Sequence, residues 1–374
     1  ALAACLLVLL ALREFRPADP GDDPRRSVGQ SPVAGKVDRT VATLIHVVGP
    51  LTEGPELVPG GRLEPGVVKI EAGVALLRFD QAVEVTLQGP AELKIFSADE
   101  TRLEFGLLAA YVPPGAEGFR VDTPRLEVVD LGTFFGVRAG PDGSVDVSVF
   151  EGAVSLQPSA DEGSQILREG NAMRLADGVS LEAVAVDTKS FAGVWEMASG
   201  ILEYSEAFAV PQPPQADRSM QSDTTVFVYR EGGFAPLSDD VRVNISRPAE
   251  YWKVSDLTES TIPRGTVVRS YLLQFRPKFR KVVRAGQYEF LNVKGELTFT
   301  DPIAGVIILE DELVASERIL ADKVAGRPRG LNRSLELSDK DFGDFLAVSE
   351  DRRTLKVHLR ATTGFSDHIR VLVQ

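Results

Sequence analysis

Short runs of apolar residues, many alternating with polar ones, dominate the chain from residue 40 onward. Clear examples are residues 67–72, 74–79, 83–87 and 107–112. Glycine and proline separate the runs at intervals of about 8–12 residues, a spacing typical of a β-sandwich, a barrel or a short β-solenoid. Because a period of two places alternate side chains on opposite faces of a strand, the pattern predicts an all-β protein.

Residues 190–208 have a different period. Apolar side chains recur there at the i, i+3, i+4 spacing of one helical face, with glutamates on the other side. The spacing predicts an amphipathic linker helix that closes a first β domain of residues 40–189. Residues 209–223 are predicted to be a linker, because their three closely spaced prolines preclude a regular helix or a central strand.

Residues 224–374 return to the strand pattern and predict a second domain, an antiparallel β-sandwich. Within residues 354–360 the leucines and valine point one way, while Lys356, His358 and Arg360 point the other, as in a half-buried antiparallel strand. Residues 310–324 are expected to form a short helix or an irregular excursion. The other expected strands are residues 225–230, 241–246, 266–275, 296–300, 304–309 and 368–373.

The chain begins with an unbroken apolar run, residues 1–12, which ends at Arg13. A helix that crosses a bilayer needs about 20 residues, so we interpret the run as the end of a membrane helix. The core of a signal peptide and an ordinary buried helix are the alternatives. Residues 13–39 are rich in Pro, Gly, Asp and Arg and predict a flexible tether. The single cysteine, Cys5, lies inside the apolar run.

Composition excludes several functional classes. The 374 residues carry 41 Lys and Arg and 54 Asp and Glu, a net charge of −13, which argues against general binding of nucleic acid. One cysteine excludes an internal disulfide and a zinc site with two or more thiolates. Only three histidines are present, which argues against a His-rich metal or acid–base site.

Charge is divided unevenly along the chain. Residues 40–190 hold 11 Lys and Arg against 23 Asp and Glu, a net of −12, whereas residues 222–374 hold 23 and 22, a net of +1. The second region contains a cluster between residues 264 and 284 with seven basic side chains and no acidic one. Its centre is either a solvated loop or a patch that binds anionic envelope polymers or the acidic first domain. The candidate anion-binding residues are Arg276, Lys278, Arg280, Lys281 and Arg284.

The most specific segment is residues 118–154. It reads F-R-V-D-T-P from Phe119, V-V-D-L-G-T-F-F-G-V from Val128, and V-S-V-F-E-G-A-V from Val147. This order predicts strands separated by a Thr-Pro turn and glycine turns. Asp130 stands in an apolar stretch, and burying its carboxylate is costly unless backbone N–H groups bind it. We therefore interpret Asp130 as a turn cap in preference to a catalytic acid.

This segment resembles the FecR family, and the resemblance extends over about residues 44–187. The stretches L-E-P-G from Leu63 and L-Q-G-P-A-E-L from Leu87 also look like that family. One departure is Phe134, which stands where the family often has Glu. The resemblance implies a β-roll, short solenoid or sandwich fold. The motif positions, to which we assign a structural role, are Thr123, Pro124, Asp130, Gly132, Thr133, Phe135, Gly136, Phe150 and Gly152.

The resemblance also implies a function. FecR-type domains are envelope domains of membrane-anchored bacterial regulators, typically paired with an extracytoplasmic-function sigma factor. We therefore expect a protein anchored in the inner membrane, with its body in the periplasm or cell envelope. It is expected to bind a protein partner there and to relay a signal to such a sigma factor.

Enzyme signatures are missing from the sequence, which has no G-x-S-x-G, P-loop, H-E-x-x-H or dinucleotide fingerprint. We expect no catalytic residues, cofactor or metal. One alternative is a secreted or surface module that binds polysaccharide or another envelope polymer through the second domain. A second alternative is a glycan-acting enzyme, which requires two carboxylates about 5–10 Å apart.

Overall fold

The structure of the chain is a computed structural model that describes residues 39–53, 58–159, 163–176, 180–212, 219–278, 291–320, 333–338, 343–361 and 366–374. Within it, Arg39–Gln374 form one compact unit. The predicted membrane or signal segment, residues 1–12, lies outside the described residues, as does the predicted tether up to residue 38. No helix in the described ranges is both long and apolar enough to cross a membrane.

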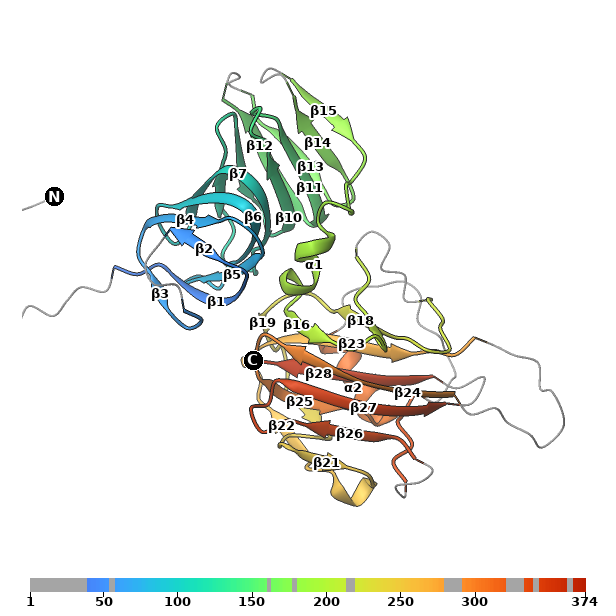
Figure 1. The fold of residues 1–374 in the computed structure, drawn as a ribbon. Coiled ribbons are helices and arrows are strands. Elements are labelled where there is room, and N and C mark those ends of the chain that lie inside the picture. The colour runs from blue at the N-terminus through green and yellow to red at the C-terminus, as the bar shows by residue number, and fades with distance from the viewer. Residues whose placement is uncertain are drawn as a thin grey trace, which may run out of the picture. The chain divides into compact units, whose positions relative to one another are not determined.

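Strands make up most of the regular structure, so the predicted all-β class is confirmed (Figure 1). They gather in two lobes that have separate hydrophobic cores. We call strands β1–β15 the N-terminal lobe and strands β16–β28 the C-terminal lobe. The chain passes from one lobe to the other through a short helix, α1 (Ala192–Ala198).

The N-terminal lobe is a single 15-stranded sheet, mostly antiparallel. Two long strands form its spine, because β6 pairs with β4, β5 and β7, while β7 also pairs with β8 and β10. From β7 the sheet continues through β10, β11, β14 and β15 on one side and through β8, β9, β12 and β13 on the other. The strands are β1 (Ala42–Val48), β2 (Leu51–Glu53), β3 (Arg62–Leu63), β4 (Gly66–Ile70), β5 (Val74–Phe79), β6 (Glu84–Ile95), β7 (Glu100–Tyr111), β8 (Arg120–Asp122), β9 (Leu126–Asp130), β10 (Phe134–Ala139), β11 (Val145–Glu151), β12 (Ala153–Pro158), β13 (Gln165–Arg168), β14 (Ala172–Leu175) and β15 (Leu181–Val184).

The sheet of the N-terminal lobe encloses an apolar core. Leu77, Leu93, Leu103, Phe135 and Val147, from five different strands, are fully buried in it. Alternation along the strands supplies these side chains, because one face of each strand points inward. This core holds the motif strands β9 to β12 in fixed register.

The helix predicted for residues 190–208 is shorter than expected. It ends at Ala198, and Gly200 then adopts a positive φ of 83° that a helix cannot continue through. Ile201 pairs with Phe299 in a sheet, so backbone pairing replaces the last predicted helical turns. Consequently the C-terminal lobe begins at Ile201, well before residue 224.

The C-terminal lobe contains two main sheets. One has the order β16-β24-β27-β26-β21, and the other has the order β17-β18-β23-β28-β25 with β19 also paired to β23; β20 and β22 form a separate pair. The elements are β16 (Ile201–Tyr204), β17 (Phe208–Ala209), β18 (Val226–Arg230), β19 (Ala235–Pro236), β20 (Val241–Val243), β21 (Ala249–Tyr251), the 3₁₀ turn η1 (Val254–Asp256), β22 (Ser260–Ile262), β23 (Val267–Phe275), β24 (Leu291–Phe299), β25 (Ile303–Ile307), α2 (Glu310–Leu320), β26 (Phe345–Val348), β27 (Thr354–Ala361) and β28 (Asp367–Val373).

The two sheets of the C-terminal lobe share one core, as in a β-sandwich. Leu297 and Leu355 from the five-stranded sheet pack in the same cluster as Leu273, Ile369 and Val371 from the other sheet. The alternation predicted for residues 354–360 is confirmed in β27, where the apolar side chains face this core. The opposite side of the five-stranded sheet therefore carries the polar side chains.

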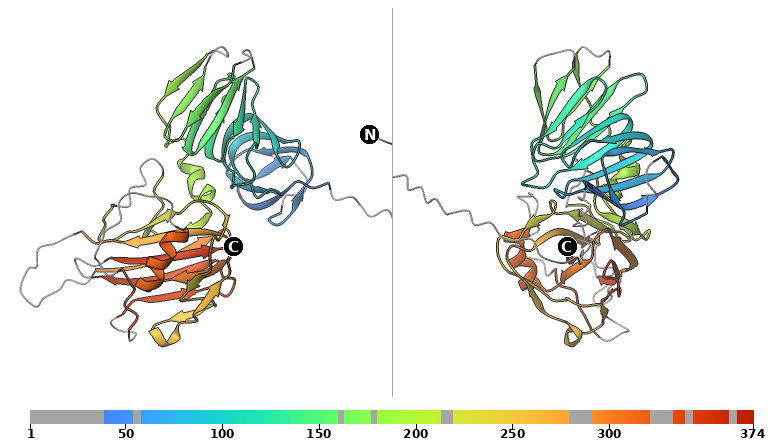
Figure 2. Two further views of the ribbon diagram at one scale, coloured as in Figure 1. Left: turned by 180° about the vertical axis from the view of Figure 1, so that it is seen from behind. Right: turned by 90° about the vertical axis from the view of Figure 1, so that its left-hand side faces the viewer.

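The segment predicted as a short helix or an excursion forms α2 over its described part. Leu313 of α2 packs on Leu372 and Ile307, and Figure 2 shows α2, drawn orange, lying across the strands. A buried ion pair fixes the sheet beneath it, because Arg370 binds Glu231 at 2.7 Å and also donates to Ser316 of α2 at 2.6 Å. The outer face of the six-stranded sheet is thus covered, whereas α2 does not lie on the five-stranded sheet.

A glycine on β10 allows the helix to approach the sheet. A Cβ atom added at Gly136 would lie 2.2 Å from the ring of Phe191, just before α1. We expect Gly136→Ala to lower the free energy of unfolding by about 1–3 kcal/mol, because the ring must move out of a packed cluster. Urea denaturation followed by tryptophan fluorescence measures this, since Trp195 lies in the same cluster.

Gly66→Ala is the matched control. Gly66 also lies in a strand, but its added Cβ would have no atom closer than 3.8 Å. This variant is expected to change stability by less than about 0.5 kcal/mol. Equal unfolding midpoints for the two variants would contradict the packing argument.

Candidate functional site

Four of the motif residues that the sequence singled out lie in two turns that touch. Asp130 ends β9 with its side chain buried, and the backbone N–H of Gly132 donates to its carboxylate at 2.7 Å. The hydroxyl of Thr133 donates to the carbonyl of Ala153 at 2.6 Å. Gly152 has a positive φ of 80°, and a Cβ atom there would lie 2.2 Å from the Gly132 carbonyl oxygen. The glycines are needed because the two turns approach so closely.

Burial controls the charge of Asp130. Removal from water raises the pKa of its carboxyl to about 6, although hydrogen bonds from Thr133 and Gly132 act in the opposite direction. The nearby Glu117 raises the pKa further, because two like charges disfavour ionisation. The arrangement around Asp130 is that of a turn cap.

The Thr-Pro turn of the motif closes on itself. The Thr123 hydroxyl donates to the Leu126 carbonyl at 2.9 Å and accepts from the Leu126 N–H at 2.9 Å. Pro124 is exposed, whereas Phe135 is fully buried in the core of the N-terminal lobe. These positions support the fold and present no reactive group.

An aromatic cluster joins the motif to α1. Phe134 stacks on Trp195 with ring centroids 5.1 Å apart, and Phe150 meets Phe191 edge-on at 5.3 Å. The guanidinium of Arg230, from the C-terminal lobe, lies 4.3 Å from the centre of the Phe134 ring. Phe134 is fully buried, so the residue that departs from the FecR pattern contacts both α1 and the C-terminal lobe.

A buried ionic network connects the two lobes. Glu84, at the start of β6, forms an ion pair with Arg269 of β23, and both side chains are almost completely buried. Glu84 also accepts from Arg78 at 2.7 Å, and Arg78 binds Asp301 of the C-terminal lobe at 2.9 Å. Burial alone would raise the pKa of Asp301, but the hydrogen bond and charge of Arg78 outweigh it and hold that pKa below its usual value.

The chain makes room for this network at two glycines. A Cβ atom at Gly200 would lie 2.4 Å from a guanidinium nitrogen of Arg269. One at Gly233 would lie 1.4 Å from the hydroxyl oxygen of Tyr111, across the junction. Arg269 itself lies over the ring of Phe234, 4.3 Å from its centroid. The lobes are therefore in van der Waals contact around the ion pairs.

A cavity of about 500 Å³ opens beside this junction. Its walls include the motif turn at Gly132 and Thr133, the exposed Leu131, and the Glu231–Gly233 segment of the C-terminal lobe. One side of the motif turn is therefore buried and supports the fold, and its other side is accessible from the cavity. A cavity of this size is within the range of small-ligand and side-chain pockets.

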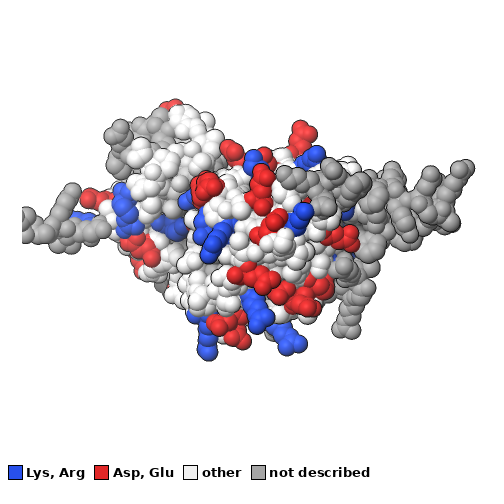
Figure 3. Space-filling view, turned by 90° about the horizontal axis from the view of Figure 1, so that it is seen from below, with Lys and Arg blue, Asp and Glu red and all other residues white. Residues whose placement is uncertain are grey.

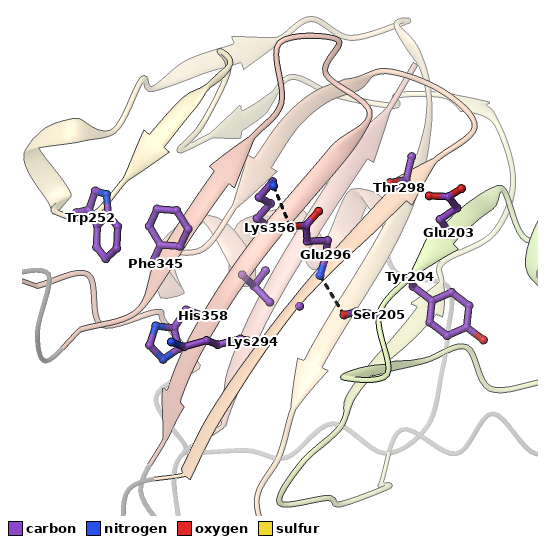
Figure 4. A pocket seen from close by; sticks show the side chains of 12 residues that line it. Glu203, Tyr204, Ser205, Trp252, Lys294, Glu296, Thr298, Phe345, Lys356 and His358 are labelled. Carbon is purple, nitrogen blue, oxygen red and sulfur yellow. Dashed lines mark hydrogen bonds and ion pairs between the residues drawn. The ribbon is translucent and has the colours of Figure 1, made fainter.

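A larger depression, of about 720 Å³, lies on the outer face of the five-stranded sheet (Figure 4). Lys356 of β27 forms an ion pair with Glu296 of β24 at 2.8 Å across its floor. The Glu296 N–H donates to the Ser205 hydroxyl at 3.1 Å. The floor is therefore polar, with side chains held in place across neighbouring strands.

Aromatic side chains stand at both sides of this floor (Figure 4). Trp252 and Phe345 lie with ring centroids 4.1 Å apart at an angle of 36°, and Tyr204 lies on the opposite side. The Tyr204 hydroxyl donates to Glu196 of α1 at 2.6 Å. Burial and this carboxylate raise the pKa of Tyr204 to about 12, so its hydroxyl stays protonated.

The depression carries balanced charge. Lys294 and Lys356 oppose Glu203 and Glu296, and His358 is neutral at pH 7. Burial lowers the pKa of His358 to about 4, and the positive charges of Lys294 and Arg360 contribute. Figure 3 shows acidic and basic side chains interspersed on another side of the molecule, the one drawn lowest in Figure 1.

Comparison with known proteins gives a family match within the N-terminal lobe. Residues 70–155 match the family model described as FecR protein. This part of the chain is similar to FecR domains. The matched residues include the Thr-Pro turn, both glycine turns and the aromatic strands, so the predicted resemblance is confirmed over this range. The comparison with curated proteins found no match.

Two crystal structures share a weaker likeness with part of this chain. Both are described as a "putative anti-sigma factor" from Parabacteroides distasonis, with 19% and 18% sequence identity. Each alignment covers 38% of this chain and 68% of the other chain, with a TM-score of 0.30.

The predicted basic patch lies mostly outside the described residues, which include Arg276 and Lys278 but not Arg280, Lys281 or Arg284. Lys278 is exposed, and its backbone N–H donates to Asp223 at 3.0 Å. The anion-binding patch stays a prediction. Among the described residues, no group of three or more His, Cys, Asp or Glu side chains is placed to hold a metal ion.

Sequence reasoning missed the principal residues of both sites. Arg269 was grouped with the basic cluster, but it is buried against the FecR domain. Glu84 and Arg269 are 185 positions apart, so no local spacing indicates their pairing. Trp252 and Phe345 come from separate segments of the chain. The sequence could have indicated this site only through an aromatic residue that stands within a polar stretch.

The Glu84–Arg269 pair is testable by removing one charge. We expect Glu84→Gln to lower the free energy of unfolding by about 3–5 kcal/mol, because Arg269 is left buried without its counter-charge. The control is Asp80→Asn, which breaks the exposed Arg62–Asp80 pair and should cost less than about 1 kcal/mol. Thermal unfolding measures both, and equal losses would contradict the argument.

Asp130 predicts a pH dependence of stability. Because its pKa is raised in the folded state, the folded chain keeps a proton between about pH 4 and pH 6 that the unfolded chain has released, so stability falls as pH rises through that range. Between pH 4 and pH 7, the free energy of unfolding of Asp130→Asn should rise by up to about 3 kcal/mol relative to that of the wild type. Urea denaturation at four pH values measures this difference.

The control for this experiment is Asp142→Asn. Hydrogen bonds from Ser144 lower the pKa of the exposed Asp142. The small contribution of Asp142 to stability therefore increases as pH rises, whereas that of Asp130 decreases. An Asp130→Asn profile parallel to wild type would show that folding does not raise the pKa of Asp130.

Proposed function

We propose that this chain is the exported part of a bacterial envelope regulator that binds a protein partner and controls an extracytoplasmic-function sigma factor. The observation that carries the proposal is the FecR match over residues 70–155. FecR-type domains are regulatory, so the match supports signalling and not catalysis. The proposal includes an inner-membrane helix whose end is formed by residues 1–12 and a tether formed by residues 13–39.

The partner is proposed to contact the FecR domain at its motif turn. Leu131 is 48% exposed, although its neighbours Asp130 and Thr133 are buried and hydrogen-bonded. The turn is therefore rigid and presents an apolar side chain beside the 500 Å³ cavity. Apolar anchors held on rigid elements beside a cavity are typical of protein–protein contacts.

The junction offers a physical route between the two lobes. Glu84 and Arg78 of the FecR domain bind Arg269 and Asp301 of the C-terminal lobe. A partner that occupies the cavity touches both lobes at once, since Gly132 and Gly233 line the same space. Binding there would favour one arrangement of the junction over others.

Site-specific photo-crosslinking tests the contact. A photoreactive residue at Leu131, in the full chain expressed in the source bacterium, is expected to give a discrete crosslinked envelope protein. The control position is Ile166, which is 51% exposed on the edge strand β13 of the same lobe. Crosslinks from Ile166 alone, or the same products from both positions, would contradict the proposed surface.

Transcript measurements test the output. Leu131→Asp adds a charge at the contact, so we expect it to change the transcripts of one sigma-factor regulon in the same direction as deletion of the gene. Ile166→Asp should leave them at the wild-type level. Unchanged transcripts in the deletion strain would refute the regulatory role itself.

A further inference from the structure

We propose that the outer face of the five-stranded sheet binds an uncharged glycan chain, with Trp252 and Phe345 as the stacking platform for a sugar ring. This inference is independent of the proposed function, because it concerns a different surface. The depression of about 720 Å³ on this face is within the range of ligand sites, about 300–1,000 Å³.

The side chains match the two surfaces of a sugar. A pyranose ring has a face of C–H groups and a rim of hydroxyls, so it needs an aromatic surface beside hydrogen-bonding groups. Trp252 and Phe345 supply the aromatic surface, and both are half-buried. His358 lines the floor next to it, and the polar lining continues through Lys294, Thr298 and Glu203 toward Tyr204 (Figure 4).

Charge decides between classes of polymer. The two lysines and two glutamates of the depression balance, and His358 is neutral because its pKa lies at about 4. A polyanion or a polycation would therefore meet as many like charges as opposite ones. An uncharged, hydroxyl-rich chain can use both the donors and the acceptors of the floor.

The platform is fixed before any ligand arrives. The indole N–H of Trp252 donates to Glu250 at 3.1 Å. The carboxylate of Asp256 accepts from the backbone N–H groups of Trp252 and Lys253 at 3.0 and 2.9 Å. A side chain held in this way loses little conformational freedom on binding, which favours affinity.

The opposite end of the face is tied to the FecR domain through α1. Tyr204 borders the depression and donates to Glu196 of α1 at 2.6 Å, and α1 packs on Phe134 through Trp195. A glycan that spans the depression from Trp252 to Tyr204 would therefore contact the element that connects the lobes.

Affinity electrophoresis of the full chain tests the inference. Each gel contains one uncharged polysaccharide, which is a β-glucan, a xylan or a galactomannan. A gel with polygalacturonate serves as the anionic comparison. At least one uncharged glycan is expected to retard the wild-type chain. Trp252→Ala and Phe345→Ala should each weaken that binding about tenfold or more, which corresponds to about 1.4 kcal/mol.

Two further variants separate binding from folding. Phe96→Ala removes an exposed aromatic residue of the FecR domain and should bind as wild type does. Lys294→Ala changes an exposed side chain of the floor and should weaken binding while circular dichroism and thermal unfolding stay unchanged. This keeps the test valid if Trp252→Ala fails to fold.

Each remaining outcome overturns the inference. Retardation by polygalacturonate alone would indicate an anion site, and wild-type affinity in both aromatic variants would place the ligand elsewhere. Shortened oligosaccharides would show cleavage in place of simple binding, and no retardation by any uncharged glycan would refute the site. Photo-crosslinking from Leu131 in the Trp252→Ala chain remains a separate readout of the proposed regulatory contact.

Discussion

The junction of the two lobes depends on the buried ion pair between Glu84 and Arg269. Neither charge is tolerable alone in that environment, because each would be removed from water without compensation. Arg78 and Asp301 extend the pair into a network with members from both lobes. The FecR domain and the C-terminal sandwich therefore form one compact unit, although each has its own hydrophobic core.

The FecR motif is mainly a packing pattern. Gly132 and Gly152 let two turns touch, and Gly136 admits the ring of Phe191. Phe134, where the family often has Glu, stacks on Trp195 and lies under Arg230. The aromatic side chain at this position therefore connects the motif to both α1 and the C-terminal lobe.

Two accessible surfaces among the described residues carry the proposed contacts. One is the cavity beside the exposed Leu131, and the other is the aromatic and polar face of the five-stranded sheet. Helix α1 is physically connected to both lobes, through Trp195 to the FecR domain and through the Glu196–Tyr204 hydrogen bond to that sheet. A protein contact and a glycan contact on one unit would suit a regulator that responds to the cell envelope.

The sequence by itself determined the all-β class, the FecR domain and individual strands such as β5 and β27, because strand period and glycine turns are local properties. Only the tertiary structure decided where α1 ends, since Ile201 pairs with a strand far along the chain. The same reason applies to the sites. Arg269 acquires its partner, and Trp252 meets Phe345, only when distant strands come together, and no spacing along the chain encodes such contacts.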